Sequence, residues 1–147
     1  MPSLFDSYEL RGLTLRNRIV MSPMCQYSCV KGDGKATDWH MVHIATRAVG
    51  GVGLAIMEAA AVEPRGRISR EDLGIWDDEH IVPLQRVVEV TKSNGAAVGI
   101  QLAHAGRKAG TPENGNWEYG QIAPSPVQFD DGWHVPNELD QDGIAIR

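Results

Sequence analysis

Three apolar runs of this sequence are each followed by residues whose types could do chemistry. The runs cover residues 18–21, 54–57 and 97–102. The groups that follow or end them are Ser22-Pro23-Met24-Cys25-Gln26-Tyr27, Glu58-Ala59-Ala60 and Gln101-Leu102-Ala103-His104-Ala105-Gly106-Arg107-Lys108. A tyrosine hydroxyl can donate a hydrogen bond to a carbonyl oxygen and polarise it. A glutamine amide both donates and accepts, so it can pair with a carbonyl beside an N–H. Whether these groups act together depends on the elements that carry them.

The apolar runs are typical of buried strands, and helices are predicted between them. Residues 18–21, 54–57 and 97–102 are short and rich in apolar residues, and Pro23 ends the first because it has no N–H for a ladder. Thr37 is a good N-cap for a helix that Gly50-Gly51 ends. A second helix is expected to begin near Asp77 or Asp78, with Pro83 in its first turn, and to end at Asn94-Gly95.

The flanking segments are less regular. The residues around Gly12 predict a short N-terminal hairpin or cap. Residues 111–147 are rich in proline, glycine, asparagine and aspartate, with one possible short strand at 127–129.

The order strand, helix, strand, helix, strand predicts an α/β fold with parallel strands and right-handed crossovers. An open doubly wound sheet and a (β/α)₈ TIM barrel both fit this order. The third strand has one bulky face and one small face carrying Gln101, which favours a barrel, where the site lies at the C-terminal ends of the strands. A barrel needs eight units and about 250 residues. We therefore expect residues 1–147 to be the first three units and the hairpin of a single, incomplete TIM-barrel domain.

Composition excludes several other classes. The formal net charge of −5 argues against a nucleic-acid partner. No stretch approaches the ~20 apolar residues of a membrane span, and the N-terminus has no apolar signal core. The chain has two cysteines, Cys25 and Cys29, which suits a reducing, cytoplasmic location.

Four motifs in order resemble one family. NRIVMSPMC at 17–25, DLGIW at 72–76, QLAHAGRK at 101–108 and IAPS at 122–125 are similar to the N-terminal signature of old yellow enzymes. Cys25 with a tyrosine two residues later resembles the bacterial subclass of xenobiotic reductases and NADPH dehydrogenases. The resemblance covers nearly all of residues 4–126. It implies an FMN-dependent ene-reductase, in which NADPH or NADH reduces the flavin and the flavin then reduces the C=C bond of an enone or enal.

The resemblance also implies roles for individual residues. Gln101 would bind the polar edge of the flavin ring, Cys25 would lie near the flavin and tune it, and Tyr27 would contact the substrate carbonyl as the catalytic and substrate-binding residue. The other implied cofactor contacts are Ser22, Pro23, Met24 and Ala59. The proton donor and the phosphate-binding loops would lie further along the barrel. We thus expect the activity only in a longer parent chain, which would be a homo-oligomer, and no activity from these residues alone.

Three alternatives stay open. The chain could be a non-catalytic truncated barrel that binds little or no flavin. It could be a zinc-dependent barrel hydrolase, because His40 and His43 lie three residues apart on the first predicted helix, although the sequence offers no further ligand at a suitable spacing. It could also be a dienoyl-thioester reductase with a downstream iron–sulfur cluster.

Overall fold

A parallel sheet forms the centre of the chain, as the sequence predicted. The computed structural model describes residues 1–110 and 120–145. Strand β4 (Leu54–Ala61) pairs along its whole length with β6 (Ala97–Ala103), and its other edge pairs with β3 (Val20–Met21). A further strand, β5 (Leu73–Gly74), pairs with the last residues of β4 on the same edge as β3. Among the described residues, β6 has a partner strand on one edge only.

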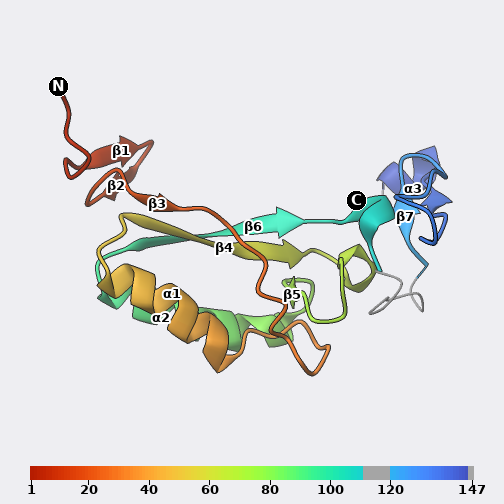
Figure 1. Ribbon diagram of the computed structural model, residues 1–147, viewed down its shortest axis with the longest axis horizontal. Coiled ribbons are helices and arrows are strands. Elements are labelled where there is room, and N and C mark those ends of the chain that lie inside the picture. The colour runs from red at the N-terminus through yellow and green to blue at the C-terminus, as the bar shows by residue number, and fades with distance from the viewer. Residues whose placement is uncertain (111–119, 146–147) are drawn as a thin grey trace.

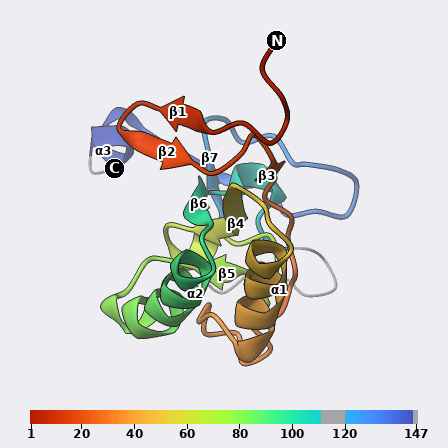
Figure 2. The same ribbon diagram turned by 90° about the vertical axis from the view of Figure 1, so that its left-hand side faces the viewer.

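Both long helices lie on one face of this sheet (Figure 1, Figure 2). Helix α1 (Asp38–Val49) follows the N-cap Thr37 and ends at Gly50, as predicted. Helix α2 (Ile81–Ser93) is preceded by a short 3₁₀ turn, Asp78–His80, so that Pro83 stands in its first turn, where no intrahelical N–H is needed. Sequential strands with their helices on one face are the arrangement of a barrel wall.

The core fills the space between the sheet and these helices. Fully buried side chains come from both layers: Cys29, Ile44, Ala55, Met57, Ala60, Leu73 and Val87. Because Ala55, Met57 and Ala60 belong to this core, their face of β4 packs against the helices. The opposite face of β4 would point to the interior of a barrel. No helix among the described residues is long and apolar enough to cross a bilayer.

The two ends of the chain lie outside this layer structure. A hairpin of β1 (Tyr8–Leu10) and β2 (Leu13–Leu15) turns at Gly12, which confirms the predicted N-terminal hairpin. Beyond β6 come two 2-residue strands, β7 (Ile122–Ala123) and β8 (Asn137–Glu138), and the short helix α3 (Gln141–Ala145). The strand predicted at 127–129 is wrong, because this segment pairs with no strand and Val127 and Phe129 are exposed. Of the expected irregular region 111–147, residues 111–119, 146 and 147 lie outside the described residues.

Candidate functional site

The three chemical groups predicted from the sequence lie toward the C-terminal ends of parallel strands. The first group follows β3, whereas Glu58-Ala59-Ala60 and Gln101-Leu102-Ala103 belong to the last residues of β4 and β6. A β-bulge shapes this rim, because Met57 pairs with Ile100 whereas Ala59 pairs with Gln101, so Glu58 is an extra residue on β4. The bulge shifts the alternation of side chains along β4. It places Ala59 directly beside Gln101 in register, and it leaves Glu58 buried on the side of the helices.

Cys25, Tyr27 and Ala59 come together at this rim. The Tyr27 side chain and the backbone of Ala59 lie near the Cys25 sulfur, and both lower the pKa of the thiol. Tyr27 has a backbone φ of 49°, in the left-handed region that a bulky residue seldom adopts. Such conformations are maintained where surrounding contacts impose them and are frequent at functional sites. The segment 25–27 is therefore a tight turn that brings a thiol and a phenol to the same place.

Both side chains stay protonated at neutral pH. Burial raises the pKa of the Cys25 thiol, and the negative charges of Asp72 and Glu58 raise it further. Burial also raises the pKa of the Tyr27 hydroxyl, with smaller contributions from Cys25 and Asp72. A neutral phenol can donate a hydrogen bond to a carbonyl oxygen, whereas a phenolate cannot.

Gln101 presents a free amide at the same rim. Its side chain is exposed and hydrogen-bonds to no other residue of the described chain. At Gly99, two residues earlier on the same face, an added Cβ would meet only an ordinary contact, 3.9 Å from Ile56. A flat ring with a polar edge fits this surface, because small residues leave room for the ring and the amide can both donate to it and accept from it. The residues present thus fit the flavin that the sequence motifs imply.

The segment 22–24 leads from β3 to Cys25. Ser22 and Met24 are exposed and Pro23 is half-buried. The Met24 carbonyl accepts a hydrogen bond of 2.9 Å from the Gln26 side-chain amide, which helps to close the turn. The roles assigned to these residues, and to Cys25, Tyr27, Ala59 and Gln101, stay predictions.

The sequence interpretation placed Glu58 in the second group but gave it no role, and it considered His40 as a ligand only in the zinc alternative. The backbone N–H of Thr37 donates to Nδ1 of His40 (2.9 Å), and Nε2 of His40 faces Oε1 of Glu58 at 3.1 Å, with both side chains almost fully buried. His40 therefore caps the start of α1 through Nδ1 and lies beside the Glu58 carboxylate through Nε2. Within residues 1–110 and 120–145, no three histidine, cysteine or acidic side chains gather as metal ligands. The signal for Glu58 is an acidic residue inside the apolar run of β4.

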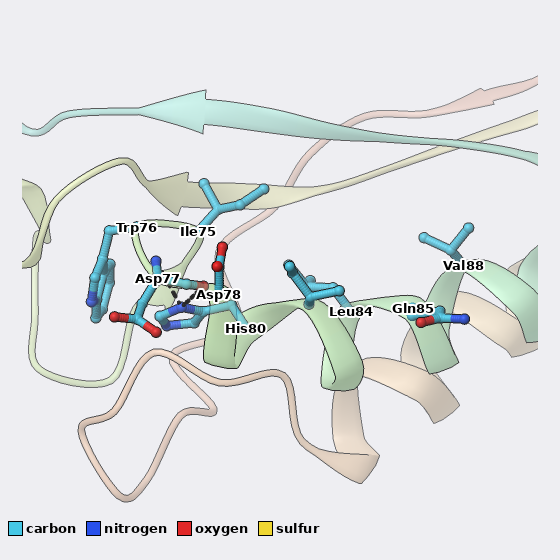
Figure 3. Close-up of a pocket in the computed structure, with 9 residues that line it drawn as sticks. Ile75, Trp76, Asp77, Asp78, His80, Leu84, Gln85 and Val88 are labelled. Carbon is cyan, nitrogen blue, oxygen red and sulfur yellow. Dashed lines mark hydrogen bonds between the residues drawn. The ribbon is translucent and has the colours of Figure 1, made fainter.

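A cavity of the described chain lies away from this rim. It has a volume of about 770 Å³ and lies between α2 and the segment after β5, where Ile75, Leu84 and Val88 meet Asp77 and Asp78 (Figure 3). None of the predicted site residues lines it. It is therefore a hollow on the helical face of the sheet and forms no part of the candidate site.

Comparison with known proteins defines the class. Residues 3–145 match the model of the NADH:flavin oxidoreductase / NADH oxidase family, and the chain belongs to this family. It is 54% identical over 136 residues to an NADPH dehydrogenase of Geobacillus thermodenitrificans, and 51% identical over 145 residues to one of Listeria monocytogenes. These alignments cover 92% and 98% of the chain but 38% and 41% of the relatives, so the chain spans about two fifths of their length.

Solved structures agree on the fold. Morphinone reductase in complex with tetrahydroNAD superposes with a TM-score of 0.85 at 27% identity, over 99% of this chain and 43% of that one. The old yellow enzyme homologue from Zymomonas mobilis gives a TM-score of 0.86 at 26% identity, over 99% and 42%. The chain is thus a partial α/β barrel of the old yellow enzyme type. This result confirms the barrel over the open doubly wound sheet, and it confirms the family resemblance.

Proposed function

We propose that residues 1–147 form the N-terminal part of a single FMN-binding barrel domain in an ene-reductase. This enzyme would use NADPH or NADH to reduce the C=C bond of an α,β-unsaturated carbonyl compound, an enone or enal. One observation carries the proposal: the free amide of Gln101 stands in register beside Ala59, next to the Cys25–Tyr27 pair. Family membership and relatives named NADPH dehydrogenase support it.

Each residue of the rim has a task in this proposal. When bound, FMN would supply the hydride for the β-carbon of the substrate after taking it from the nicotinamide. Gln101 would bind the polar edge of the ring. The small side chain of Ala59 would let the ring approach the barrel wall beside Gln101. Ser22, Pro23 and Met24 would line the approach from β3. Their contacts position the ring and carry out no proton transfer.

Cys25 and Tyr27 would act nearest to the reacting atoms. The neutral Cys25 thiol would adjoin the ring and set its reduction potential through polarity and not through charge. The Tyr27 hydroxyl would donate a hydrogen bond to the substrate carbonyl, drawing electrons from the double bond. Protonation of the α-carbon requires an acid, which we assign to the part of the barrel that these 147 residues do not include.

The remaining parts of the proposal concern the longer protein. The ribityl phosphate would be held by loops after later strands, where barrels usually bind phosphate. Charge-assisted hydrogen bonds to that phosphate would provide much of the affinity for FMN. We also propose a homo-oligomer in the cytoplasm, where Cys25 and Cys29, both free in the structure, would stay reduced.

The test begins with flavin retention. A protein of the relatives' length that contains this chain is incubated with FMN and desalted, and its visible spectrum is recorded beside that of the 147-residue chain. We expect a retained flavin band in the longer protein, which NADPH or NADH bleaches and an enone restores under anaerobic conditions. A longer protein that folds but retains no flavin would contradict the proposal.

The same experiment shows whether the 147-residue chain binds FMN without the rest of the barrel. A retained flavin band there would mean that the first three units hold FMN by themselves or by self-association. A soluble, folded chain without flavin would be a non-catalytic fragment, which is the alternative that the open edge of β6 favours.

A further inference from the structure

The carboxylate of Glu58 is buried between the site and helix α1. Its side chain is 4% exposed, and its Oε2 accepts a hydrogen bond of 2.8 Å from the backbone N–H of Gln26. Its Oε1 lies 3.1 Å from Nε2 of His40, which is 2% exposed. A buried carboxylate is costly unless it is paired and hydrogen-bonded. Oε2 of Glu58 therefore has a definite hydrogen-bond partner, whereas Oε1 lies within ion-pair distance of His40 Nε2 without forming a hydrogen bond to it.

Gln26 is the residue between the thiol and the phenol of the candidate site. Its backbone N–H binds Glu58, and its side-chain Oε1 accepts a hydrogen bond of 3.1 Å from the indole N–H of Trp39 on α1. Gln26 is thus tied to β4 through its backbone and to α1 through its side chain. The next residue, Tyr27, has the left-handed backbone conformation. A conformation of this kind costs roughly 1–3 kcal/mol and persists only where neighbouring contacts impose it.

The β-bulge connects Glu58 to the other wall of the site. Glu58 is the extra residue of the bulge, and the backbone of Ala59, the next residue, interacts with the Cys25 thiol. One residue therefore contacts the 25–27 turn with its side chain while its backbone places the neighbour that meets Cys25. The side chain of Glu58 and the strand register at Glu58 therefore both influence the positions of Cys25 and Tyr27.

We propose that Glu58 is a positioning residue, whose buried carboxylate holds the Gln26 backbone and thereby fixes Cys25 and Tyr27 against β4. It touches neither substrate nor cofactor. Its effect on a bound flavin rests on the function proposed above, whereas its effect on the turn is a property of this chain alone. The test therefore uses the chain without flavin.

The first measurement is amide hydrogen exchange at single-residue resolution in the unmodified chain. The Gln26 amide is expected to exchange at least about tenfold more slowly than in an unstructured peptide, as a lost hydrogen bond costs about this factor. The Cys29 amide is a reference in the same segment, because it donates to the Glu71 carbonyl (3.0 Å) and not to Glu58. A Gln26 amide that exchanges at the unstructured rate while Cys29 is protected would overturn the proposal without any variant.

Variants then separate positioning from general stability. Glu58→Ala should accelerate exchange at Gln26 about tenfold and leave Cys29 protected. Glu58→Gln keeps an oxygen that can accept from the Gln26 N–H, so it should restore most of the protection. Asp72→Ala is the matched control, since Asp72 is another buried carboxylate, but it accepts from the backbone of Ile68 and Ser69. It should expose those two amides and leave Gln26 unchanged.

Thiol alkylation provides a second readout of the same turn. Cys29 is fully buried, and burial raises its pKa to about 12, so iodoacetamide should label only Cys25 in the folded chain. Glu58→Ala should make Cys25 react several-fold faster while Cys29 stays unreactive. If Gln26 protection and Cys25 reactivity in Glu58→Ala equal those of the unmodified chain, Glu58 has no positioning role. A chain that passes these tests but whose longer form binds no flavin would refute the proposed function and leave this inference standing.

Discussion

Removal of the Gln101 amide should weaken flavin binding without weakening the fold. In the folded chain the side chain is exposed and has no hydrogen-bond partner among the described residues. Truncation to alanine therefore breaks no hydrogen bond to a described residue, and exposed substitutions of this kind change stability by about 0.5 kcal/mol or less. Gln101→Ala should therefore weaken FMN binding and leave the free energy of unfolding almost unchanged.

The magnitude follows from the number of hydrogen bonds that the amide can make. One donor and one acceptor facing a ring edge give two bonds, each with a net value of about 0.5–1.5 kcal/mol. Their loss amounts to about 1–3 kcal/mol, which corresponds to a rise in the Kd for FMN of roughly 5- to 150-fold. The phosphate contacts of the longer protein would be unchanged, so binding should be weakened and not abolished.

The assay is a titration of FMN fluorescence in the longer protein, together with urea unfolding of the flavin-free form. Gln85→Ala is the matched control, because Gln85 is an exposed glutamine on α2, away from the rim, whose amide donates a hydrogen bond of 2.7 Å to Glu89. It should leave the Kd for FMN unchanged. If Gln101→Ala binds FMN within a factor of about two of the parent, well below the change expected for two lost bonds, the role assigned to Gln101 is wrong.

Three further predictions concern other residues. Cys25→Ser should shift the reduction potential of bound flavin with little change in the free energy of unfolding, and an unchanged potential in anaerobic redox titration would exclude Cys25 as a tuning residue. Gly74→Ala should destabilise the chain by about 1–3 kcal/mol in urea unfolding, because the added Cβ would lie 2.0 Å from a ring atom of Trp76, whereas Gly12→Ala, which meets open space, should have no such effect. Burial lowers the pKa of His43, with Arg47 adding to the shift, so its contribution to stability is complete above the unfolded pKa of about 6.5 and is lost as pH falls below it. His43→Leu should therefore lose less stability than the parent between pH 7 and pH 5.5, and equal losses would contradict this assignment.

Sequence patterns predicted the elements whose signals are local. Thr37, Gly50 and the apolar stripe between them define α1 within the chain segment itself, and the apolar runs of β4 and β6 have the length and composition of buried strands. The predicted start of the second helix near Asp77 holds for its 3₁₀ turn, although the α-helix begins at Ile81. The choice of a barrel needed more than periodicity, because two topologies share the same order of elements.

Features that depend on pairing could not be predicted in this way. The bulge at Glu58 is a property of two strands together, and neither sequence alone contains it. Strand β5 has two residues, too few for a periodic signal. The positive φ of Tyr27 arises where the usual marker, a glycine, is absent. The proposed role of Glu58 depends on Gln26, which lies 32 residues away in the sequence and at 2.8 Å in space.

The edge of β6 that pairs with no described strand has a consequence for how this chain behaves during synthesis. Residues 97–103 read AVGIQLA, with no charge and no proline to discourage another strand from docking. Segments of this composition tend to recruit copies of themselves into aggregates while they remain uncovered. A ribosome making a longer protein would expose this edge until the next strand emerged, at about 5–20 residues per second. Low temperature or a chaperone that shields hydrophobic segments should therefore raise the soluble yield of the 147-residue chain more than that of its longer form.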